Sequence, residues 1–370
     1  SAFFFVAFIY GNREKLFMVK TTKREQKRFK KYNKSRVELP NLVEAQLISY
    51  QSFVDKGISE VLSEFTPIED YSGKKFKLEF LDYEFIKPET DEFEAKANKK
   101  NYQASIKAKV KLTNKILKIE KEQEIFLTDF PMMTEHGTFI INGVERVVVP
   151  QLARSFGMFF TMQELKGGKY FGVKILPARG SWIEIDSEPD GLLYVKIDRK
   201  RKFLVSSLLR VMASEKTENV ADLFKDKITK EIIEKCIKHD SAKNRGESFI
   251  EIHKRLRDGE LTTANYAEAF VNSIFSSERY DLHKVGRFYF NKRFNKSLDK
   301  KELERFTLSL EDLVTIIEHI VKLNNTSNSL PDDIDHLGSR RLKYFGEMIQ
   351  QKFRVGMFQI QRNIQDRMSI

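Results

Sequence analysis

A two-residue turn between two β-branched runs most strongly constrains how this chain folds. Asn142 and Gly143 separate the runs 138–141 and 144–149. Because Asn and Gly tolerate the positive φ angles of a tight turn, the sequence predicts a β-hairpin at this position. Pro150 follows and lacks a backbone N–H donor, so we expect it to end the second strand.

The segment that follows this hairpin, 151–157, carries polar groups between apolar residues. It supplies an amide, a guanidinium, a hydroxyl and a glycine. Such groups beside a stiff hairpin suit the recognition of a phosphate chain or of a base edge. An ordinary surface loop would carry the same local chemistry, and both interpretations stay open at this point.

The chain is long enough and apolar enough for two folded domains. Its 370 residues can bury sizeable cores, and a hydrophobic content of 41% with 31 phenylalanines excludes a largely disordered protein. The net charge of +12 favours a polyanionic partner, most often nucleic acid. Cys236 is the single cysteine, which excludes an internal disulfide and is typical of a reducing cytoplasm. We expect its thiol to be a small core group and not a nucleophile.

The N-terminal residues are expected to lie outside the folded part of the chain. The apolar run 1–11 is too short to span a bilayer, and it lacks the basic leader of a secretory signal. Met18 resembles a natural start, so we interpret residues 1–17 as upstream translated or added sequence. The stretch 20–36 holds nine basic residues and one acid. It is either an arm that binds nucleic acid or a solvated leader.

Two helical stretches are predicted between residues 39 and 67. Asn41 is expected to cap the first helix, with Glu44 completing the cap three residues later. Gly57 is expected to interrupt this helix, and Pro67 to end the second helical face that follows.

Alternating apolar and charged residues then predict three strands, at 76–80, 106–112 and 124–127. Lys107, Lys109 and Lys111 fall on one face of the second strand, at a spacing close to that of phosphates along a nucleic-acid strand. The sequence therefore allows two interpretations of this face, a phosphate-tracking surface or a merely solvated one.

The only tryptophan, Trp182, follows a predicted turn at 177–181. A lone tryptophan is usually part of a core, but beside Arg179 it is also placed to stack on an unpaired base. Asp198 precedes four consecutive cations, 199–202, which form the densest basic cluster of the chain. This cluster is a candidate for phosphate contacts, with a solvated turn as the alternative.

Strand patterns continue through the middle of the chain, and helical patterns dominate its second half. Strands are predicted at 170–175, 182–185 and 192–197, helices at 203–269, 310–323 and 342–368, and a polar linker at 324–329. The sequence contains no glycine-rich phosphate loop, no paired cysteines for zinc and no closely spaced pair among its six histidines. Nothing in it assembles a catalytic centre.

Several long motifs follow one another along the chain. They are LPNLVEAQLISYQSF (39–53), DFPMMTEHGTFIINGVERVVVPQLARSFG (129–157), RGSWIEI (179–185), KIDRKRKF (196–203), RYDLHKVGR (279–287), DDIDHLGSRR (332–341) and the helical stretch 345–369. Taken together, they resemble the N-terminal third of the β subunit of bacterial DNA-dependent RNA polymerase. The resemblance runs almost continuously from about Val37 to Ile370, and it is specific because the motifs stand in the family's order.

The resemblance implies an α+β fold with two domains. A discontinuous protrusion domain of mixed sheet and helices is expected at 37–145 and 338–370, after a basic leader at 1–36 that is partly non-native. A mixed α/β lobe domain is expected as an insertion at 146–337. In the family these domains form one jaw of the main cleft. The lobe faces downstream DNA, and the protrusion side faces the RNA–DNA hybrid and the upstream edge of the bubble.

The resemblance also implies a non-catalytic part of a nucleotidyltransferase, DNA-directed RNA polymerase. The family's catalytic magnesium is held by aspartates of the β′ subunit, so this chain is expected to hold no cofactor and to be inactive alone. The implied partners are DNA, RNA, the rest of β, β′, the α dimer, ω and a sigma factor, with no membrane. The implied location is the cytoplasm, at the nucleoid.

Residue roles are carried over by matching positions. One side of a pocket for an unpaired non-template base matches Arg154, Trp182 and Asp198, and the other side matches Ile334, Asp335 and Arg340. An indole stacks on any base, while a carboxylate and a guanidinium read one base edge. Backbone phosphates are expected at the cations Arg199, Lys200, Arg201 and Lys202.

A second set of positions, Arg146, Val149 and Gln151, resembles the N-terminal edge of the family's rifamycin pocket near the path of nascent RNA. The family usually has serine, histidine and proline where this chain has Pro150, Ala153 and Phe156. We therefore expect a loop of different stiffness and polarity after the hairpin, with altered contacts around Arg154.

Two functions from other classes remain as alternatives at this point. The same lobes would suit a free-standing nucleic-acid-binding or polymerase-regulatory module. They would also suit a structural scaffold that makes no direct contact with DNA.

Overall fold

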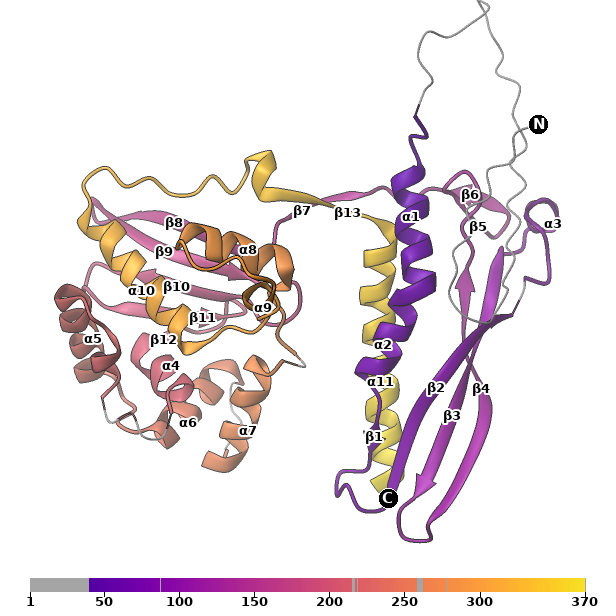
Figure 1. The fold of residues 1–370 in the computed structure, drawn as a ribbon, viewed down its shortest axis with the longest axis horizontal. Coiled ribbons are helices and arrows are strands. Elements are labelled where there is room, and N and C mark those ends of the chain that lie inside the picture. The colour runs from indigo at the N-terminus through magenta and orange to yellow at the C-terminus, as the bar shows by residue number, and fades with distance from the viewer. Residues whose placement is uncertain are drawn as a thin grey trace, which may run out of the picture. The chain divides into compact units, whose positions relative to one another are not determined.

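The computed structural model describes residues 40–86, 88–214, 217, 219–257, 262–277 and 279–369 (Figure 1). The predicted basic leader at 1–36, including residues 1–17 and the stretch 20–36, lies outside the described residues. The remainder, from Val43 onward, is one unit with two hydrophobic cores.

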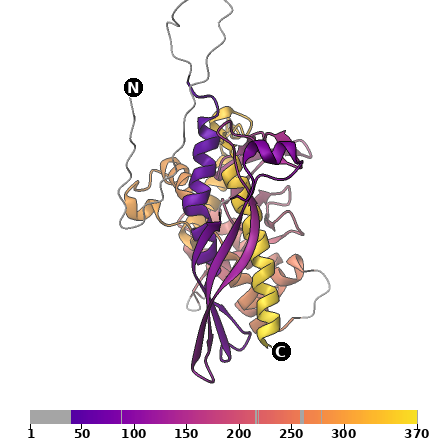
Figure 2. The ribbon, with the colours of Figure 1, turned by 90° about the vertical axis from the view of Figure 1, so that its right-hand side faces the viewer.

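The first core is built from helices at both ends of the described chain. The N-terminal helices are α1 (Glu44–Ser52), a π-helical turn η1 (Phe53–Gly57) and α2 (Ile58–Glu64), and the C-terminal one is α11 (Phe345–Ser369). α11 packs along all three, and both views show it beside α1 (Figures 1 and 2). The ring centroids of Phe139 and Phe345 lie 4.4 Å apart in this core.

Two local predictions for these helices are wrong. Asn41 does not cap α1, because the N-cap residue is Val43 and no side chain caps the helix. Gly57 does not interrupt the helix, because the backbone passes through η1 and continues directly into α2. Packing against α11 overrides the local signals: Gln46, in α1, accepts a hydrogen bond from the N–H of Phe345, and the glutamine Gln350 of α11 donates to the carbonyl of Gly57.

A four-stranded antiparallel sheet completes the first core, in the order β1-β2-β3-β4. Its strands are β1 (Ile68–Glu69), β2 (Phe76–Ile86), β3 (Gln103–Asn114) and β4 (Ile119–Pro131), with the short helix α3 (Glu92–Ala97) between β2 and β3. The three strands predicted from alternation are confirmed, and each is longer than its apolar run.

The predicted hairpin is confirmed. β5 (Phe139–Ile141) pairs with β6 (Val144–Arg146), and Asn142 and Gly143 form the turn with φ of 53° and 76°. The second strand ends at Arg146, well before Pro150, so the proline does not terminate it.

The segment after the hairpin is a strand, which corrects the expectation of a loop. β7 (Gln151–Arg154) pairs antiparallel with β13 (Arg340–Lys343), a strand from the far end of the chain. Residues 342 and 343 therefore belong to this ribbon and not to the predicted helix. No local pattern reveals such pairing, because each strand is short and its partner is remote in sequence.

The second core lies on a five-stranded antiparallel sheet in the order β12-β11-β10-β9-β8. Its strands are β8 (Gly157–Leu165), β9 (Gly168–Leu176), β10 (Ile183–Ser187), β11 (Leu193–Ile197) and β12 (Phe203–Leu204). The predicted strands in this region are confirmed. β10 is buried along its whole length, which explains why its sequence does not alternate cleanly.

Helices cover this sheet and fill the rest of the second core. They are α4 (Val205–Met212), α5 (Lys227–His239), α6 (Arg245–Leu256), α7 (Ala264–Phe275), α8 (His283–Arg293), α9 (Lys300–Leu303) and α10 (Leu310–Asn325), with short 3-10 turns η2 (Val220–Leu223) and η3 (Leu337–Ser339). The helices within 203–269 and at 310–323 are confirmed, except that residues 203 and 204 form the strand β12, while the helices at 283–293 and 300–303 are not among the predicted ones. Helices α4, α5, α6, α8 and α10 contact the sheet directly. A buried ion pair between Arg287 and Asp312, 2.9 Å apart, joins α8 to the start of α10.

The close approach of α1 and α11 predicts a stability effect at Gly346. A Cβ at this position would clash with the backbone carbonyl of Ser49, so we expect Gly346→Ala to lower the free energy of unfolding by about 2–3 kcal/mol. In the same helix, Gly356 has no atom within 4 Å of such a Cβ. Gly356→Ala should therefore raise the free energy of unfolding by about 0.5–1 kcal/mol. Urea unfolding midpoints of the two variants measure the difference, and equal shifts would contradict the close packing.

Candidate nucleic-acid interface

Trp182 lies in a turn that Asp198 fastens. One oxygen of the Asp198 carboxylate, Oδ1, accepts a hydrogen bond from the backbone N–H of Trp182 at 2.8 Å, and Oδ2 accepts one from the hydroxyl of Ser181 at 2.7 Å. The N–H of Asp198 donates in turn to the carbonyl of Trp182 at 2.8 Å. The indole is half-buried, so it is neither a pure core residue nor fully exposed.

The residues facing this tryptophan sit in a tight left-handed turn. Asp198 and Arg199 have φ of 51° and 58°, and the N–H of Lys200 closes the turn by donating to the carbonyl of Ile197 at 3.0 Å. Positive φ is uncommon for arginine, so the surrounding structure imposes this conformation. The turn brings the Arg199 guanidinium over the indole, with 5.0 Å between its central carbon and the ring centroid.

The basic cluster that begins at Arg199 is not uniformly available to a partner. Lys200 donates to the carbonyl of Leu256 at 2.7 Å, and Lys202 forms an ion pair with Glu188 at 2.5 Å. Arg199 keeps 65% of its side chain exposed, and its nearest carboxylate, Glu184, is 4.0 Å away. Of these three cations, Arg199 therefore makes the weakest polar contacts with the rest of the chain.

The second predicted group gathers on the β7–β13 ribbon. Arg154 and Arg340 are directly opposite each other in the antiparallel register, so their side chains share one face. Arg340 approaches Asp335 at 3.4 Å, and 81% of the Asp335 side chain is exposed. Arg154 is exposed and makes no hydrogen bond or ion pair with any described residue. Ile334 precedes Asp335 in the same segment.

The structure therefore forms two groups from the predicted site residues. Trp182, Asp198 and Arg199 contact one another where β10 begins and β11 ends. In the second group, Arg340 contacts Asp335 and lies opposite Arg154, while Ile334 is placed next to Asp335 by the sequence. The members of the second group are Arg154, Ile334, Asp335 and Arg340.

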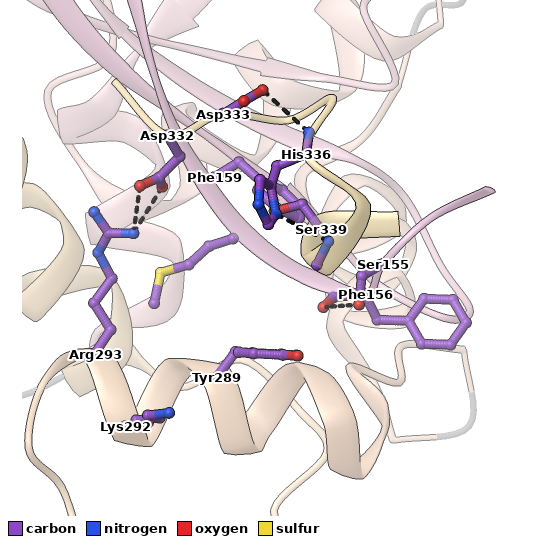
Figure 3. Close-up of a pocket in the computed structure, with 12 residues that line it drawn as sticks. Ser155, Phe156, Phe159, Tyr289, Lys292, Arg293, Asp332, Asp333, His336 and Ser339 are labelled. Carbon is purple, nitrogen blue, oxygen red and sulfur yellow. Dashed lines mark hydrogen bonds and ion pairs between the residues drawn. The ribbon is translucent and has the colours of Figure 1, made fainter. Parts of the chain in front are cut away.

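A pocket of about 560 Å³ adjoins the ribbon, and sequence reasoning missed it (Figure 3). Its walls come from the start of β8, from α8 and from the segment before β13. Phe156, Met158 and Phe159 supply apolar surface, while the polar side chains include Tyr289, Lys292, Arg293, Asp332, Asp333 and His336. Only the DDIDHLGSRR motif pointed to this segment, and its Asp332 had no predicted role.

The three residues matched to the rifamycin edge lie on the path from the hairpin to the ribbon. Arg146 ends β6, Val149 is 71% exposed, and Gln151 begins β7 opposite Lys343. All three side chains are exposed. Phe156, one of the positions that depart from the family pattern, packs against Arg341. The guanidinium carbon of Arg341 lies 4.1 Å from the ring centroid of Phe156.

The lysine face of β3 is balanced by acidic residues, which weighs against phosphate tracking. Lys109 pairs with Glu122 at 2.8 Å and Lys111 with Glu120 at 2.7 Å, both across to β4. Lys107 lies opposite Glu84 of β2 in the register. The solvated interpretation therefore holds for this strand, because cross-strand carboxylates already neutralise the ammonium groups.

Cys236 is fully buried in the second core, as predicted, and its Sγ accepts a hydrogen bond from the N–H of Leu193 at 3.5 Å. Burial raises the pKa of the thiol to about 11. The thiolate, which is the nucleophilic form, is therefore nearly absent at neutral pH.

This burial predicts slow chemical modification. At pH 8 we expect an aromatic disulfide reagent to label Cys236 very slowly in the folded chain and rapidly in urea, because unfolding restores an ordinary thiol pKa. As the chain has one cysteine, the absorbance of the released thiolate reports this site alone. Equal labelling rates in the two states would contradict the burial of the thiol.

Across the part of the chain that the structure describes, no group of three or more His, Cys, Asp and Glu side chains is arranged to hold a metal ion. Within the same residues, no helix combines the length and the apolar character needed to cross a membrane.

Sequence comparison defines the class of protein. Residues 163–343, which carry the five-stranded sheet and its helices, match the family described as RNA polymerase Rpb2, domain 2. This region is therefore similar to a domain of RNA polymerase subunits of the Rpb2 type.

Most of the chain is similar to bacterial RNA polymerase β subunits. It is 41% identical over 339 residues to the DNA-directed RNA polymerase subunit beta of Syntrophomonas wolfei subsp. wolfei (strain DSM 2245B / Goettingen). It is 37% identical to that of Chloroflexus aggregans (strain MD-66 / DSM 9485). Each match covers 91% of this chain and 30% of the relative, so the chain spans under a third of the length of the curated relatives it matches. The chain belongs to the bacterial RNA polymerase β-subunit family.

Proposed function

We propose that this chain supplies the protrusion and lobe domains of an RNA polymerase β subunit. Its function is to position downstream DNA, the non-template strand and the RNA–DNA hybrid during transcription. The observation that carries the proposal is the Trp182 turn, in which Asp198 and Arg199 hold a half-exposed indole beside a guanidinium. A half-exposed indole on a backbone that hydrogen bonds fix is suited to stack on an unpaired base.

The groups around this indole fit recognition of one base edge. Each oxygen of the Asp198 carboxylate accepts one hydrogen bond within the chain and keeps a further lone pair for a base N–H donor. On the ribbon, Arg154 and Arg340 are donors, and Asp335 is an exposed acceptor. We propose that both groups, together with Ile334, contact the same non-template base.

We propose that the domains are divided as the family pattern suggests, with the protrusion at 37–145 and 338–370 and the lobe at 146–337. The distribution of buried residues supports this division. The first core draws on residues both before the ribbon strand β7 and after β13, whereas the buried residues of the second core all lie between Met158 and Val321.

The other parts of the polymerase would come from the rest of β and from other subunits. We propose that the rest of β, β′, the α dimer, ω and a sigma factor assemble with this part, in the cytoplasm at the nucleoid. The β′ subunit would hold the catalytic magnesium, so the protrusion and lobe would be inactive alone. Arg146, Val149 and Gln151 would line the edge of the RNA path, which their exposure permits.

Trp182→Ala tests the stacking role. In the assembled polymerase we expect it to weaken binding of bubble-containing DNA by roughly 5- to 100-fold, the loss of one stacked base, with little effect on plain duplex. Trp182→Phe keeps an aromatic face and should retain most of the affinity. Fluorescence anisotropy with the two DNAs measures the difference, and an equal loss on both would exclude stacking at Trp182.

The exposed cation Arg199 gives a second test. We propose that cluster 199–202 contacts backbone phosphates and that Arg199 contributes more than Lys200 and Lys202, because the ammonium groups of these two lysines already bind Leu256 and Glu188. Arg199→Ala should reduce the slope of log affinity against log salt concentration by about 0.7–0.9, the value for one phosphate contact.

Lys200→Ala is the matched control for this test. It removes the same charge from the neighbouring position, but its ammonium is tied to the carbonyl of Leu256, so the salt slope should change less. A slope that Arg199→Ala leaves unaltered would exclude a phosphate contact there.

A further inference from the structure

Asp332 ties the segment before β13 to the outer edge of β8. β8 is an edge strand of the five-stranded sheet. The N–H of Asp332 donates to the carbonyl of Phe160 at 2.8 Å, and its carboxylate accepts from the N–H of Phe160 at 2.8 Å. One residue thus satisfies both backbone groups that the edge strand presents at Phe160.

Arg293, the last residue of α8, secures the same carboxylate. Its Nη1 donates to both oxygens of Asp332, at 2.8 and 2.7 Å, as Figure 3 shows. The guanidinium carbon lies 4.5 Å from the ring centroid of Phe160. Because the Phe160 side chain is fully buried, this arginine connects the segment to the second core. We call Asp332, Arg293 and Phe160 the Asp332 clasp.

The six residues after the clasp form an arm, 333–338, that is also fixed at its far end. Ser155 donates its N–H to the carbonyl of Ser339 at 2.9 Å, directly before the ribbon begins at Arg340. Within the arm, the Asp333 carboxylate accepts hydrogen bonds from the N–H groups of Asp335 and His336, at 2.9 and 3.1 Å. The arm is therefore short, internally bonded and anchored at both ends.

We propose that Asp332 and Arg293 are positioning residues, which hold the arm so that Ile334 and Asp335 meet the non-template base. This inference rests on the base contact proposed above. An exposed loop carrying Asp335 would lose conformational freedom on binding, and a clasp that restricts it beforehand reduces this cost. The Asp332 side chain is half-buried, with 25% of it exposed, whereas 81% of the Asp335 side chain is exposed.

The test uses the assembled polymerase and two bubble DNAs. One carries an intact non-template strand, and the other lacks the single base that Trp182 is proposed to grip. The dissociation constant of the DNA that lacks the base, divided by that of the intact DNA, measures recognition of this base alone. Asp332→Ala should lower this ratio by about three- to tenfold, the range expected for the loss of one ordinary hydrogen bond, and Asp332→Asn should lower it less. Arg293→Ala should act in the same direction.

Asp222→Asn is the matched control for Asp332→Asn. Asp222 lies in η2, which packs on α4 and α5, and it forms an exposed ion pair with Lys230 at 2.5 Å. Its replacement by asparagine removes the same charge from an ion pair that does not involve the arm. The ratio should stay unchanged in this variant. In hydrogen exchange, Asp332→Ala should speed exchange in residues 333–338 while β10 stays protected.

A double variant separates positioning from an independent contact. If Asp332 acts through the arm, adding Asp335→Ala to Asp332→Ala should lower the ratio little further. Fully additive effects, or an equal loss of affinity for both DNAs with Asp332→Ala, would overturn the inference. If Trp182→Ala and Asp335→Ala themselves leave the ratio unchanged, the proposed base contact fails. If they lower it while Asp332→Ala does not, only the clasp fails.

Discussion

The pairing of β7 with β13 is the constraint on which the rest of the structure depends. These two short strands join the segment after the hairpin to the segment before α11, so the intervening chain is closed into a unit with its own core. A two-stranded ribbon is marginal by itself. Contacts at its flanks support it: Arg341 stacks on Phe156 and forms an ion pair with Glu347 at the start of α11, with both N–O distances at 2.5 Å.

The same ribbon explains why the candidate site is charged and exposed. Two arginines directly opposite each other repel, and such pairs destabilise a sheet unless an anion lies near them. Asp335 supplies a carboxylate at 3.4 Å from Arg340, but Arg154 finds no anionic partner among the described residues. The ribbon therefore carries positive charge that is only partly compensated within the described residues, and a phosphate of a nucleic-acid strand is suited to compensate the rest.

Features that depend on neighbouring residues were predictable from the sequence, and features that depend on remote partners were not. The Asn142-Gly143 hairpin and the burial of Cys236 follow from local turn chemistry and apolar periodicity. The sequence of β7 has the polar composition of a loop, and its partner strand lies at the other end of the chain. Asn41 has the side chain of a typical cap, but the N-cap residue of α1 is Val43. For the candidate site, the motifs pointed to Trp182 and Asp335, but Arg293 acquires its place only through the fold.

The net charge of the chain is a poor guide to where a polyanion would bind, because many of its cations are already neutralised. Lys109 and Lys111 face carboxylates across β3 and β4, and Lys202 faces Glu188. What distinguishes Arg154 and Arg199 is exposure combined with a backbone that is fixed by pairing or by a tight turn. A cation held in this way loses little conformational entropy when it binds a phosphate or a base. The positions best suited to bind nucleic acid are therefore those where the fold fixes the backbone and leaves the cation exposed.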